Sequence, residues 1–404
     1  MTRSVAELEA AGLLKVEDGN HGEYRPRPGE FTTEGVVYVR AADVNSGRVD
    51  FEAAAKISPN AVARIRKGIG RDLDVLISHK GTVGRVALVP EGSPPFVCSP
   101  QTTFWRSRDH RVLDPRYLRS FLQCDFFVHQ LDTLKASTDM APYVSLTQQR
   151  AMIVRVPPPA EQRAIAEVMG ALDDKIAANT RLATTADALA RLDFARALDL
   201  PGIEAIAVGQ CATTVLGGTP SRDELSYWTG GTVGWLNSGK ANEARILEPS
   251  EWITEEALSK STAKVMPQRA TVVAITGATL GQVARLEITA SGNQSLIGIW
   301  SDEPAMNDWI YFAIQHEIPQ LLRAATGAAQ QHVNKRDLDA LVLPILDGVE
   351  LATWGERVRP LLDLAAARER ESLTLATTRD ALLPALMSGK LRVRDAERVV
   401  EEVV

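Results

Sequence analysis

The segment LATTADAL occupies residues 182–189, and LATTRDAL occupies residues 375–382. Seven of the eight residues are identical, and the copies lie 193 residues apart, nearly half of the 404-residue chain. Both copies lie in stretches rich in Ala, Leu and Arg, which favour helix. A helical segment that recurs half a chain apart indicates an internal duplication, so the sequence around each copy decides the fold.

The first copy lies in a long predicted helix. Pro157, Pro158 and Pro159 precede it, and proline suits the first turn of a helix but cannot continue a strand ladder. Nearly forty residues follow with no proline and with Gly170 as their one glycine. One stripe runs along this helix at spacings of three and four residues, and it comprises Ile165, Met169, Leu172, Ile176, Asn179, Ala183, Ala186 and Ala190. Its small residues predict a partner helix that approaches closely.

The second copy lies in a second predicted helix, from Leu351 to Met387. Its apolar residues follow one heptad-like track, which comprises Trp354, Val358, Leu361, Ala365, Leu375, Leu382 and Leu386. Pro360 and Pro384 predict a break or kink near each position. We expect the two helices to pair antiparallel, with the octapeptides as equivalent turns.

The remaining sequence consists of short apolar runs of β type, interrupted by clusters of Gly, Pro and Asn. GTVGRVA (81–87) aligns with ATLGQVA (278–284) at an offset of 197, and Gln101 aligns with Gln294 at 193. The predicted fold is therefore α+β: two tandem mixed α/β domains separated by two long antiparallel, coiled-coil-like helices, with pseudo-two-fold symmetry. The expected boundaries are 1–156 (first domain), 157–200 (first helix), 201–347 (second domain), 348–388 (second helix) and 389–404 (C-terminal tail).

Composition excludes several classes of protein. Apolar residues make up 45% and charged residues 24%, as in ordinary globular proteins, and no apolar run approaches the 18 residues of a membrane span. The first 30 residues lack the apolar core of a secretory signal. Cys98, Cys124 and Cys211 are far apart, which argues against a disulfide framework or a zinc site and favours a reducing cytoplasm.

The charge is unevenly distributed. The net charge of −6 counts against a free-standing nucleic-acid binder, which is usually basic. Residues 61–120, however, carry eleven basic side chains against five acidic ones. This stretch is either an ordinary solvated surface or a patch that faces phosphates.

Motifs for catalysis fail at decisive positions. GWLNSGKA has the spacing of a phosphate-binding loop, but Ala241 stands where the loop needs a hydroxyl. HEIPQ has Gln320 in place of the second histidine of a zinc protease, and SPPF has Ser93 where an amino-methyltransferase needs Asn or Asp. Asp173 and Lys175 have the spacing of a nuclease pair, but on a long helix we expect solvated charges. We expect no catalytic residue and no metal site.

Two segments carry a family resemblance. PPPAEQRAIAEVMGALDDKI (157–176), followed by a second globule and then RDALLPALMSGKLRVRDAE (379–397), resembles the specificity (S) subunit of type I restriction-modification systems. The resemblance covers essentially the whole chain, as target-recognition domain, conserved helix, target-recognition domain and conserved helix. DGNHGEYRP (18–26) also resembles a recurrent segment of these domains. The second helix departs from the pattern, because Gly355-Glu356-Arg357 stands near the place of its EQR motif.

The resemblance implies a non-catalytic subunit that gives a larger complex its DNA address. Each target-recognition domain would read one half of a bipartite double-stranded target, and the helix pair would fix the separation of the halves. Two methyltransferase (M) subunits would supply S-adenosylmethionine and base flipping, and restriction (R) subunits would supply ATP hydrolysis and cleavage with Mg²⁺. The chain itself would hold no cofactor, bind no membrane and act in the cytoplasm.

The candidate DNA-contacting residues are polar or basic side chains in predicted loops, because such groups reach phosphates and base edges. They are Lys80, Thr82, Arg85, Gln101 and Arg106 in the first domain, with His21 and Arg40 behind them, and Asn237, Lys240, Thr279, Gln282 and Gln294 in the second. Gln101 and Gln294 have an alternative role in satisfying backbone groups at strand ends. Two other functions stay open: a stand-alone DNA-binding protein of the same fold, and a protein scaffold that binds no DNA.

Overall fold

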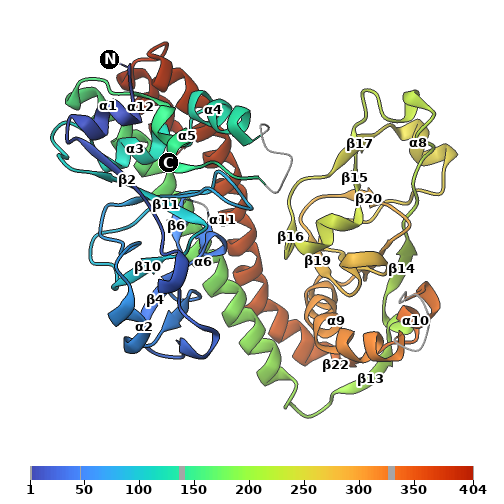
Figure 1. Ribbon diagram of the computed structural model, residues 1–404. Coiled ribbons are helices and arrows are strands. Elements are labelled where there is room, and N and C mark those ends of the chain that lie inside the picture. The colour runs from blue at the N-terminus through green and yellow to red at the C-terminus, as the bar shows by residue number, and fades with distance from the viewer. Residues whose placement is uncertain (1, 46, 136–141, 326–332, 404) are drawn as a thin grey trace. The chain divides into compact units, whose positions relative to one another are not determined.

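The computed structural model describes residues 2–45, 47–135, 142–325 and 333–403, with side chains for all of these except 324, 325, 402 and 403. The chain forms two compact units (Figure 1). The first comprises Met1–Ile176 with Thr374–Val404, and the second comprises Ala177–Leu373. The boundary between the units falls inside each of the two long helices, α6 (Pro159–Ala197) and α11 (Gly348–Ser388).

The first globule runs from β1 to β12 and contains two four-stranded sheets. One sheet is antiparallel, in the order β2-β11-β8-β9; the other has the order β10-β4-β7-β3, with β10 and β4 parallel. β1 pairs with β12 and brings the two ends of the globule together. The strands are β1 (Thr2–Ser4), β2 (Leu14–Asp18), β3 (Phe31–Thr32), β4 (Val36–Val39), β5 (Val44–Asn45), β6 (Arg48–Val49), β7 (Ala55–Ile57), β8 (Val75–Ser78), β9 (Val86–Leu88), β10 (Phe96–Cys98), β11 (Thr102–Ser107) and β12 (Ile153–Arg155).

Helices cover the antiparallel sheet and join it to the ends of the long helices. Trp105 and Phe127 meet edge to face in a core that also contains Met169 of α6 and Leu386 of α11. The helices of this unit, besides α6 and α11, are α1 (Val5–Ala10), α2 (Pro59–Arg64), α3 (Pro115–Phe121), α4 (Asp125–Lys135), α5 (Leu146–Ala151) and α12 (Val393–Val403), with 3₁₀ turns η1 (Gly22–Tyr24), η2 (Pro28–Glu30) and η3 (Ala41–Asp43). The first globule and the helix ends therefore share one core.

The second globule runs from β13 to β22 and repeats this plan. Its larger sheet has the order β14-β21-β18-β19-β16, its smaller sheet has the order β17-β15-β20, and β13 pairs with β22. The strands are β13 (Glu204–Ala207), β14 (Thr213–Leu216), β15 (Val233–Leu236), β16 (Arg245–Ile246), β17 (Glu251–Ile253), β18 (Thr271–Ala274), β19 (Val283–Leu286), β20 (Ala290–Gly292), β21 (Leu296–Trp300) and β22 (Val342–Ile345). Its helical segments are α7 (Val208–Cys211), α8 (Glu255–Lys260), α9 (Pro304–Ala325) and α10 (Lys335–Asp339), with η4 (Leu225–Tyr227), η5 (Ser238–Asn242) and η6 (Gly277–Thr279).

The strand orders establish the duplication that the octapeptides indicate. The order β2-β11-β8-β9 in the first globule corresponds to β14-β21-β18-β19 in the second, and both sets pair antiparallel. The parallel pair β4·β10 likewise corresponds to the parallel pair β15·β20. The predicted mixed α/β domains and their tandem repetition are therefore confirmed.

The two long helices pack together in each unit, in the antiparallel sense. In the first unit, Ile165 of α6 shares a core with Leu382 and Leu386 near the end of α11. In the second unit, Phe194 near the end of α6 stacks edge to face on Trp354 near the start of α11. The predicted stripes are confirmed, since their residues are buried except for Ile176 and Leu361, which are half-buried.

Three details of the helices differ from expectation. The octapeptides are not equivalent in packing, because Leu182 is 48% exposed whereas Leu375 is fully buried. α11 continues without a break through Pro360 and Pro384. Gly355 lies two turns inside α11 rather than at its start. A Cβ added to Gly355 would lie 2.8 Å from the Cβ of Ala305. Helix–helix and helix–sheet packing therefore decides these features over local sequence.

No helix among the described residues is long and apolar enough to cross a membrane. The segment expected as a C-terminal tail contains α12, an amphipathic helix whose Ala396 and Val400 are buried in the core of the first unit. The chain after α11 is therefore part of the packed structure.

Candidate nucleic-acid interface

In the first globule, polar and basic residues gather where several strands end. β4 and β10 are parallel, so Arg40 after β4 lies beside Ser99 after β10. The backbone N–H of Ser99 donates to the Val39 carbonyl at 2.7 Å, and that of Asn20 donates to the Cys98 carbonyl at 2.7 Å. We call this surface the strand-end face of the first globule, and its exposed or pocket-lining members are Arg25, Tyr38, Arg40, Lys80, Ser99, Pro100 and Gln101.

These seven residues line a pocket of about 290 Å³. Three of the side chains are cationic and none is a carboxylate, although Arg40 also pairs with Asp43 at 3.4 Å, so the pocket favours an anion or the acceptor atoms of a base edge. Tyr38 is a buried member of this lining, and burial raises the pKa of its phenol although Arg25 and Arg40 act to lower it. Its hydroxyl therefore stays neutral and can both donate and accept a hydrogen bond.

A buried histidine holds the sides of this face together. His79 follows β8, and its Nδ1 lies 3.0 Å from the Val144 carbonyl while its Nε2 lies 3.2 Å from the Pro100 carbonyl. Lys80 pairs with Tyr143 as an isolated antiparallel bridge. The ring thus fixes the turn that carries Gln101 and the strand end that carries Lys80.

The second globule has the same pattern of backbone hydrogen bonds at its strand ends, which we call the strand-end framework. The backbone N–H of Asn293 donates to the Leu236 carbonyl at 2.9 Å, and that of Gly218 donates to the Gly292 carbonyl at 2.8 Å. Because these bonds correspond to those of Ser99 and Asn20, Asn237 occupies the place of Arg40. The strand-end face of the second globule comprises Thr219, Asn237, Lys240, Thr279, Gln282 and Gln294.

Close backbone contact makes glycine necessary at equivalent places in the two globules. A Cβ on Gly19 would collide with the Ser99 carbonyl, and a Cβ on Gly217 would collide with the Asn293 carbonyl. The backbone N–H of Gly19 donates to the Thr102 carbonyl at the start of β11. The backbone N–H of Gly217 donates to the Leu296 carbonyl at the start of β21, and both distances are 2.9 Å. Both faces therefore depend on the chain after β2 or β14 lying directly against the turn.

The sequence alignment of the hairpins is confirmed. The Ser78 N–H donates to the Arg85 carbonyl at 2.9 Å, and the Ala274 N–H donates to the Gln282 carbonyl at 2.9 Å. Gly84 and Gly281, which follow the two turns, both have positive φ, at 101° and 83°. Arg85 and Gln282 are thus equivalent positions in the two globules.

The alignment of Gln101 with Gln294 is wrong by one residue. The His79 N–H donates to the Gln101 carbonyl, whereas the corresponding Ile275 N–H donates to the Ser295 carbonyl, both at 2.9 Å. Gln101 therefore corresponds to Ser295, and Gln294 corresponds to Pro100. The repeated glutamine has no common backbone role, although both side chains are exposed.

Several candidate side chains are already engaged within the chain. Arg106 makes two hydrogen bonds to the buried Asp74, at 2.6 and 2.7 Å, and lies over the ring of Phe104. Burial raises the pKa of Asp74, and Arg106 opposes this shift. The Arg85 guanidinium donates to the Ala41 carbonyl and to Asn45.

In the second globule, polar side chains of the face contact one another. Lys240 pairs with Glu243 at 2.8 Å, and Asn237 caps η5 by accepting from the Gly239 N–H at 2.9 Å. Thr219 donates to Gln294 at 2.6 Å. Thr279 is half-buried, and the candidates with exposed side chains are His21, Arg40, Lys80, Thr82, Gln101, Asn237, Gln282 and Gln294.

Sequence reasoning missed five members of the two faces, and Ser99 and Pro100 are two of them, on the turn before Gln101. Arg25 and Tyr38 of the first and Thr219 of the second come from segments that approach the turn only in the folded chain. Arg25 belongs to the segment DGNHGEYRP (18–26), but nothing in that segment predicts that it lies near Tyr38. The basic stretch 61–120 is not one patch, because Arg64, Arg106 and Arg111 pair with carboxylates in separate places.

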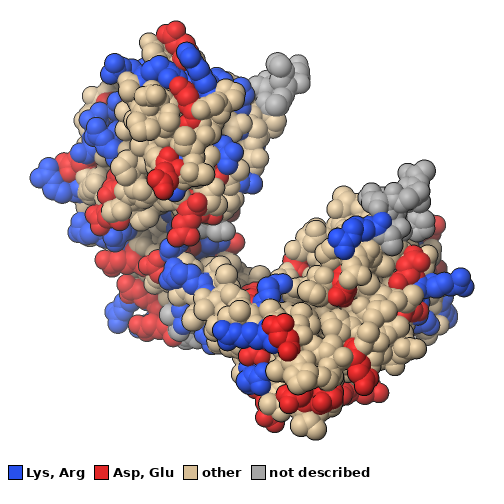
Figure 2. Space-filling model, turned by 90° about the horizontal axis from the view of Figure 1, so that it is seen from below, with Lys and Arg blue, Asp and Glu red and all other residues tan. Residues whose placement is uncertain are grey.

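The two globules differ in charge. Residues 1–156 contain 21 basic and 18 acidic side chains, whereas residues 201–347 contain 10 and 16. In the face that Figure 2 shows, Lys and Arg are numerous on the first unit, at the upper left, whereas the second unit carries acidic as well as basic side chains. Electrostatic attraction to phosphates is therefore concentrated on the first globule.

Known proteins share the sequence and the fold. Residues 13–185 match the family model for the type I restriction modification DNA specificity domain. The specificity subunit of the Escherichia coli type I restriction enzyme EcoR124I/EcoR124II is 24% identical over 148 residues, which are 35% of this chain and 37% of that protein. A Methanocaldococcus jannaschii protein assigned as the MjaX specificity subunit is 21% identical over 366 residues, 84% of this chain and 82% of that one.

The architecture agrees with a solved structure. The type I restriction-modification system S subunit from M. genitalium superposes with a TM-score of 0.63 at 15% identity, covering 96% of this chain and 95% of that one. The chain is thus similar in sequence to type I specificity subunits and has the fold of a type I S subunit. Such a subunit is the non-catalytic component of the type I enzyme, and cofactors are bound by its partner subunits in general.

Proposed function

We propose that this specificity subunit reads a bipartite double-stranded DNA target with one globule for each half-site. The proposed recognition domains are residues 1–156 and 201–347; residues 157–200 and 348–388 are the helices that separate them, and residues 389–404 are the C-terminal segment. The observation that carries the proposal is the repeated strand-end framework. Two copies of one framework, each bearing different side chains, suit a target whose two halves differ in sequence.

The side chains of the two faces support this assignment chemically. Amide side chains can form two hydrogen bonds to adenine, and lysine and arginine bind phosphates or guanine. Hydroxyl groups can bind either a phosphate or a base. We propose that Lys80, Thr82 and Gln101 contact DNA from the first globule together with Arg25 and Arg40. From the second globule we propose Asn237, Thr279, Gln282, Gln294 and Thr219. Arg85, Arg106 and Lys240 are proposed to act in support, because their head groups are engaged within the chain.

The proposed partners are two methyltransferase subunits and the restriction subunits of a type I complex, acting on DNA in the cytoplasm. The methyltransferase subunits would bring S-adenosylmethionine and flip the target base, and the restriction subunits would bring ATP and Mg²⁺. Leu182, Leu189 and Leu192 are each about half exposed on α6. Exposed leucines in a row on a helix favour a protein contact, and we propose that methyltransferase subunits cover them.

A domain exchange tests the two-reader model. Residues 203–347 are replaced by the matching domain of a relative, the chimera is expressed with the methyltransferase subunit of the host, and methylated adenines are mapped by single-molecule sequencing. One half-site should change and the other should persist. The matched control is the exchange of residues 1–156, which should change the opposite half. Changes in both halves with either exchange, or methylation independent of this chain, would contradict the proposal.

An insertion tests whether the helices measure the separation of the half-sites. Four residues inserted after Ala183 lengthen α6 by about 6 Å, at 1.5 Å per residue. Because DNA rises about 3.4 Å per base pair, the spacer should lengthen by one to two base pairs while both half-sites persist. The same four residues inserted after Gly92, in an exposed turn where nothing lies within 4 Å of an added Cβ, should leave the spacer unchanged. An unchanged spacer in the α6 variant would contradict the role of the helix.

A further inference from the structure

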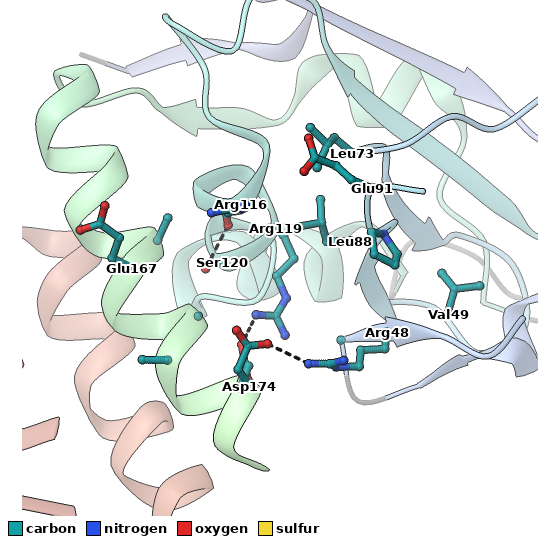
Figure 3. Close-up of a pocket in the computed structure, with 16 residues that line it drawn as sticks. Arg48, Val49, Leu73, Leu88, Glu91, Arg116, Arg119, Ser120, Glu167 and Asp174 are labelled. Carbon is teal, nitrogen blue, oxygen red and sulfur yellow. Dashed lines mark hydrogen bonds and ion pairs between the residues drawn. The ribbon is translucent and has the colours of Figure 1, made fainter. Parts of the chain in front are cut away.

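A cluster of ion pairs, the first node, joins the first globule to both long helices and consists of Asp173, Arg119 and Arg379. Asp173 of α6, whose side chain is only 13% exposed, pairs with Arg119 of α3 and also accepts from Arg379 of α11 at 2.9 Å. The next residue, Asp174, pairs with Arg48 of β6 at 2.9 Å, and Figure 3 shows this pair among the residues that line a pocket. Asp173 was expected to be a solvated helix charge, and this expectation is wrong.

A second node joins the second globule to the same two helices with the charges reversed. Arg245 of β16, whose side chain is 1% exposed, donates to both carboxylate oxygens of Asp187 on α6 and to Glu369 on α11 at 3.0 Å. Burial alone would lower the pKa of Arg245, but its bonds to Asp187 and the charge of Glu369 outweigh burial and raise the pKa. One unit thus has a carboxylate between two arginines, and the other has an arginine between two carboxylates.

In each unit the ion pairs of the node require particular partner atoms, whereas contacts between the small apolar residues nearby do not. Near the nodes α6 presents small residues such as Ala166, Gly170, Ala183 and Ala186. Ala183 and Ala186 pack with Ala365 of α11, and contacts through such small residues are roughly proportional to area and select one register only weakly. A buried charge, in contrast, must lie next to its ion-pair partners, because an unpaired buried charge is strongly destabilising.

We propose that Asp173 and Arg245 are positioning residues that fix each globule in one register on the helix pair and so set the spacing of the half-sites. This inference rests on the proposed bipartite recognition. None of the node residues belongs to the defined strand-end faces, although Lys240 lines a pocket together with Arg245 and Glu369. Their loss should therefore change the distance between half-sites and leave the half-site sequences intact.

The test uses the complete complex with its methyltransferase subunits. Asp173→Asn keeps the shape of the side chain and removes the charge that holds two arginines, and Arg245→Met does the equivalent in the second unit. Methylation at sites whose spacer differs by one base pair, relative to the normal spacer, should rise by roughly tenfold, as expected for the loss of a hydrogen bond to a charged group. Asp174→Asn is the matched control, because Asp174 is 81% exposed and pairs with Arg48 alone among the described side chains.

A second variant separates positioning from folding. Arg379→Gln removes only the α11 arm of the first node and leaves Asp173 paired with Arg119. It should assemble and relax the spacer in the same way. A spacer as strict as that of wild type in assembled variants, even with a lowered melting temperature, would overturn the inference, as would failure of both first-node variants to assemble. If wild type itself shows no bipartite target, the proposed function fails instead.

Discussion

Gln162 accepts a hydrogen bond from the backbone N–H of Asp114 at 2.9 Å and ties the start of α6 to the start of α3. Its amide group also donates to the Val112 and Pro157 carbonyls at 2.9 and 2.8 Å. The glutamine of the EQR motif is thus fully buried and satisfies three backbone groups. The motif that carries the family resemblance therefore serves the fold of this chain at this position.

Gln162→Ala should destabilise the chain by roughly 2–3 kcal/mol, because it leaves buried backbone groups without partners. The neighbouring Arg163→Ala is the control, since Arg163 is exposed and such changes cost within about 0.5 kcal/mol. Urea unfolding of the purified chain measures both. Equal midpoints for the two variants would mean that the glutamine does not hold the helix start.

The octapeptides give a comparison of identical residues in different packing. Leu375→Ala should cost roughly 2–5 kcal/mol, because Leu375 is fully buried in the core of the first unit. Leu182→Ala should cost within about 0.5 kcal/mol, because that side chain is 48% exposed. Thermal unfolding of the chain without partners measures both. Similar losses of stability would show that the two copies pack alike after all.

Gly19→Ala should damage the first strand-end face. The added Cβ would meet the Ser99 carbonyl, so either the turn or the segment after β2 must move, at a cost of roughly 1–3 kcal/mol. DNA affinity of the complex should fall with it, because Gln101 lies on the same turn. Gly29→Ala is the control, since nothing lies within 4 Å of its added Cβ. Unchanged affinity and stability for Gly19→Ala would show that the face does not depend on this contact.

The Glu30–Arg64 pair predicts a pH dependence in the first globule. The Arg64 guanidinium, bonded at 2.5 and 2.8 Å, and the Arg27 N–H lower the pKa of Glu30 from 4.5 to about 2. A carboxyl whose pKa is lower in the folded state stabilises above its unfolded pKa, and this contribution disappears as the pH falls from about 4.5 towards 2. Glu30→Gln should therefore be less stable than wild type at pH 6, with a difference that shrinks near pH 3. Urea midpoints at pH 6, 4.5 and 3 measure it, with the exposed Glu34→Gln as control. A difference independent of pH would contradict the ion pair.

Periodic features of the fold were predictable from the sequence, and long-range charge pairs were not. The stripe from Ile165 to Ala190 follows from spacing alone, because one helix face must be buried wherever a partner packs. Asp173 and Arg379 are 206 residues apart, and Arg106 and Asp74 are 32 apart. Nothing local distinguishes such charges from solvated ones, since their burial depends on elements that meet only in the folded chain. Arg106 was for that reason chosen as a DNA contact although its guanidinium is held by Asp74.

The two globules carry unequal net charge. The first is net basic and the second net acidic, so phosphate contacts should come mainly from the first. Each lysine that neutralises a phosphate steepens the dependence of log affinity on log salt by about 0.9, so Lys80→Ala should reduce this slope by about that amount and weaken binding to all sequences alike. Lys260→Ala is the control, because Lys260 is 63% exposed on α8 of the second globule and pairs with Glu256. Salt titrations of the assembled complex on its mapped target measure the slopes. If Lys80→Ala instead leaves the slope unchanged and alters the bases selected, Lys80 reads a base edge, and the electrostatic contacts of the first globule must come from other residues such as Arg25 and Arg40.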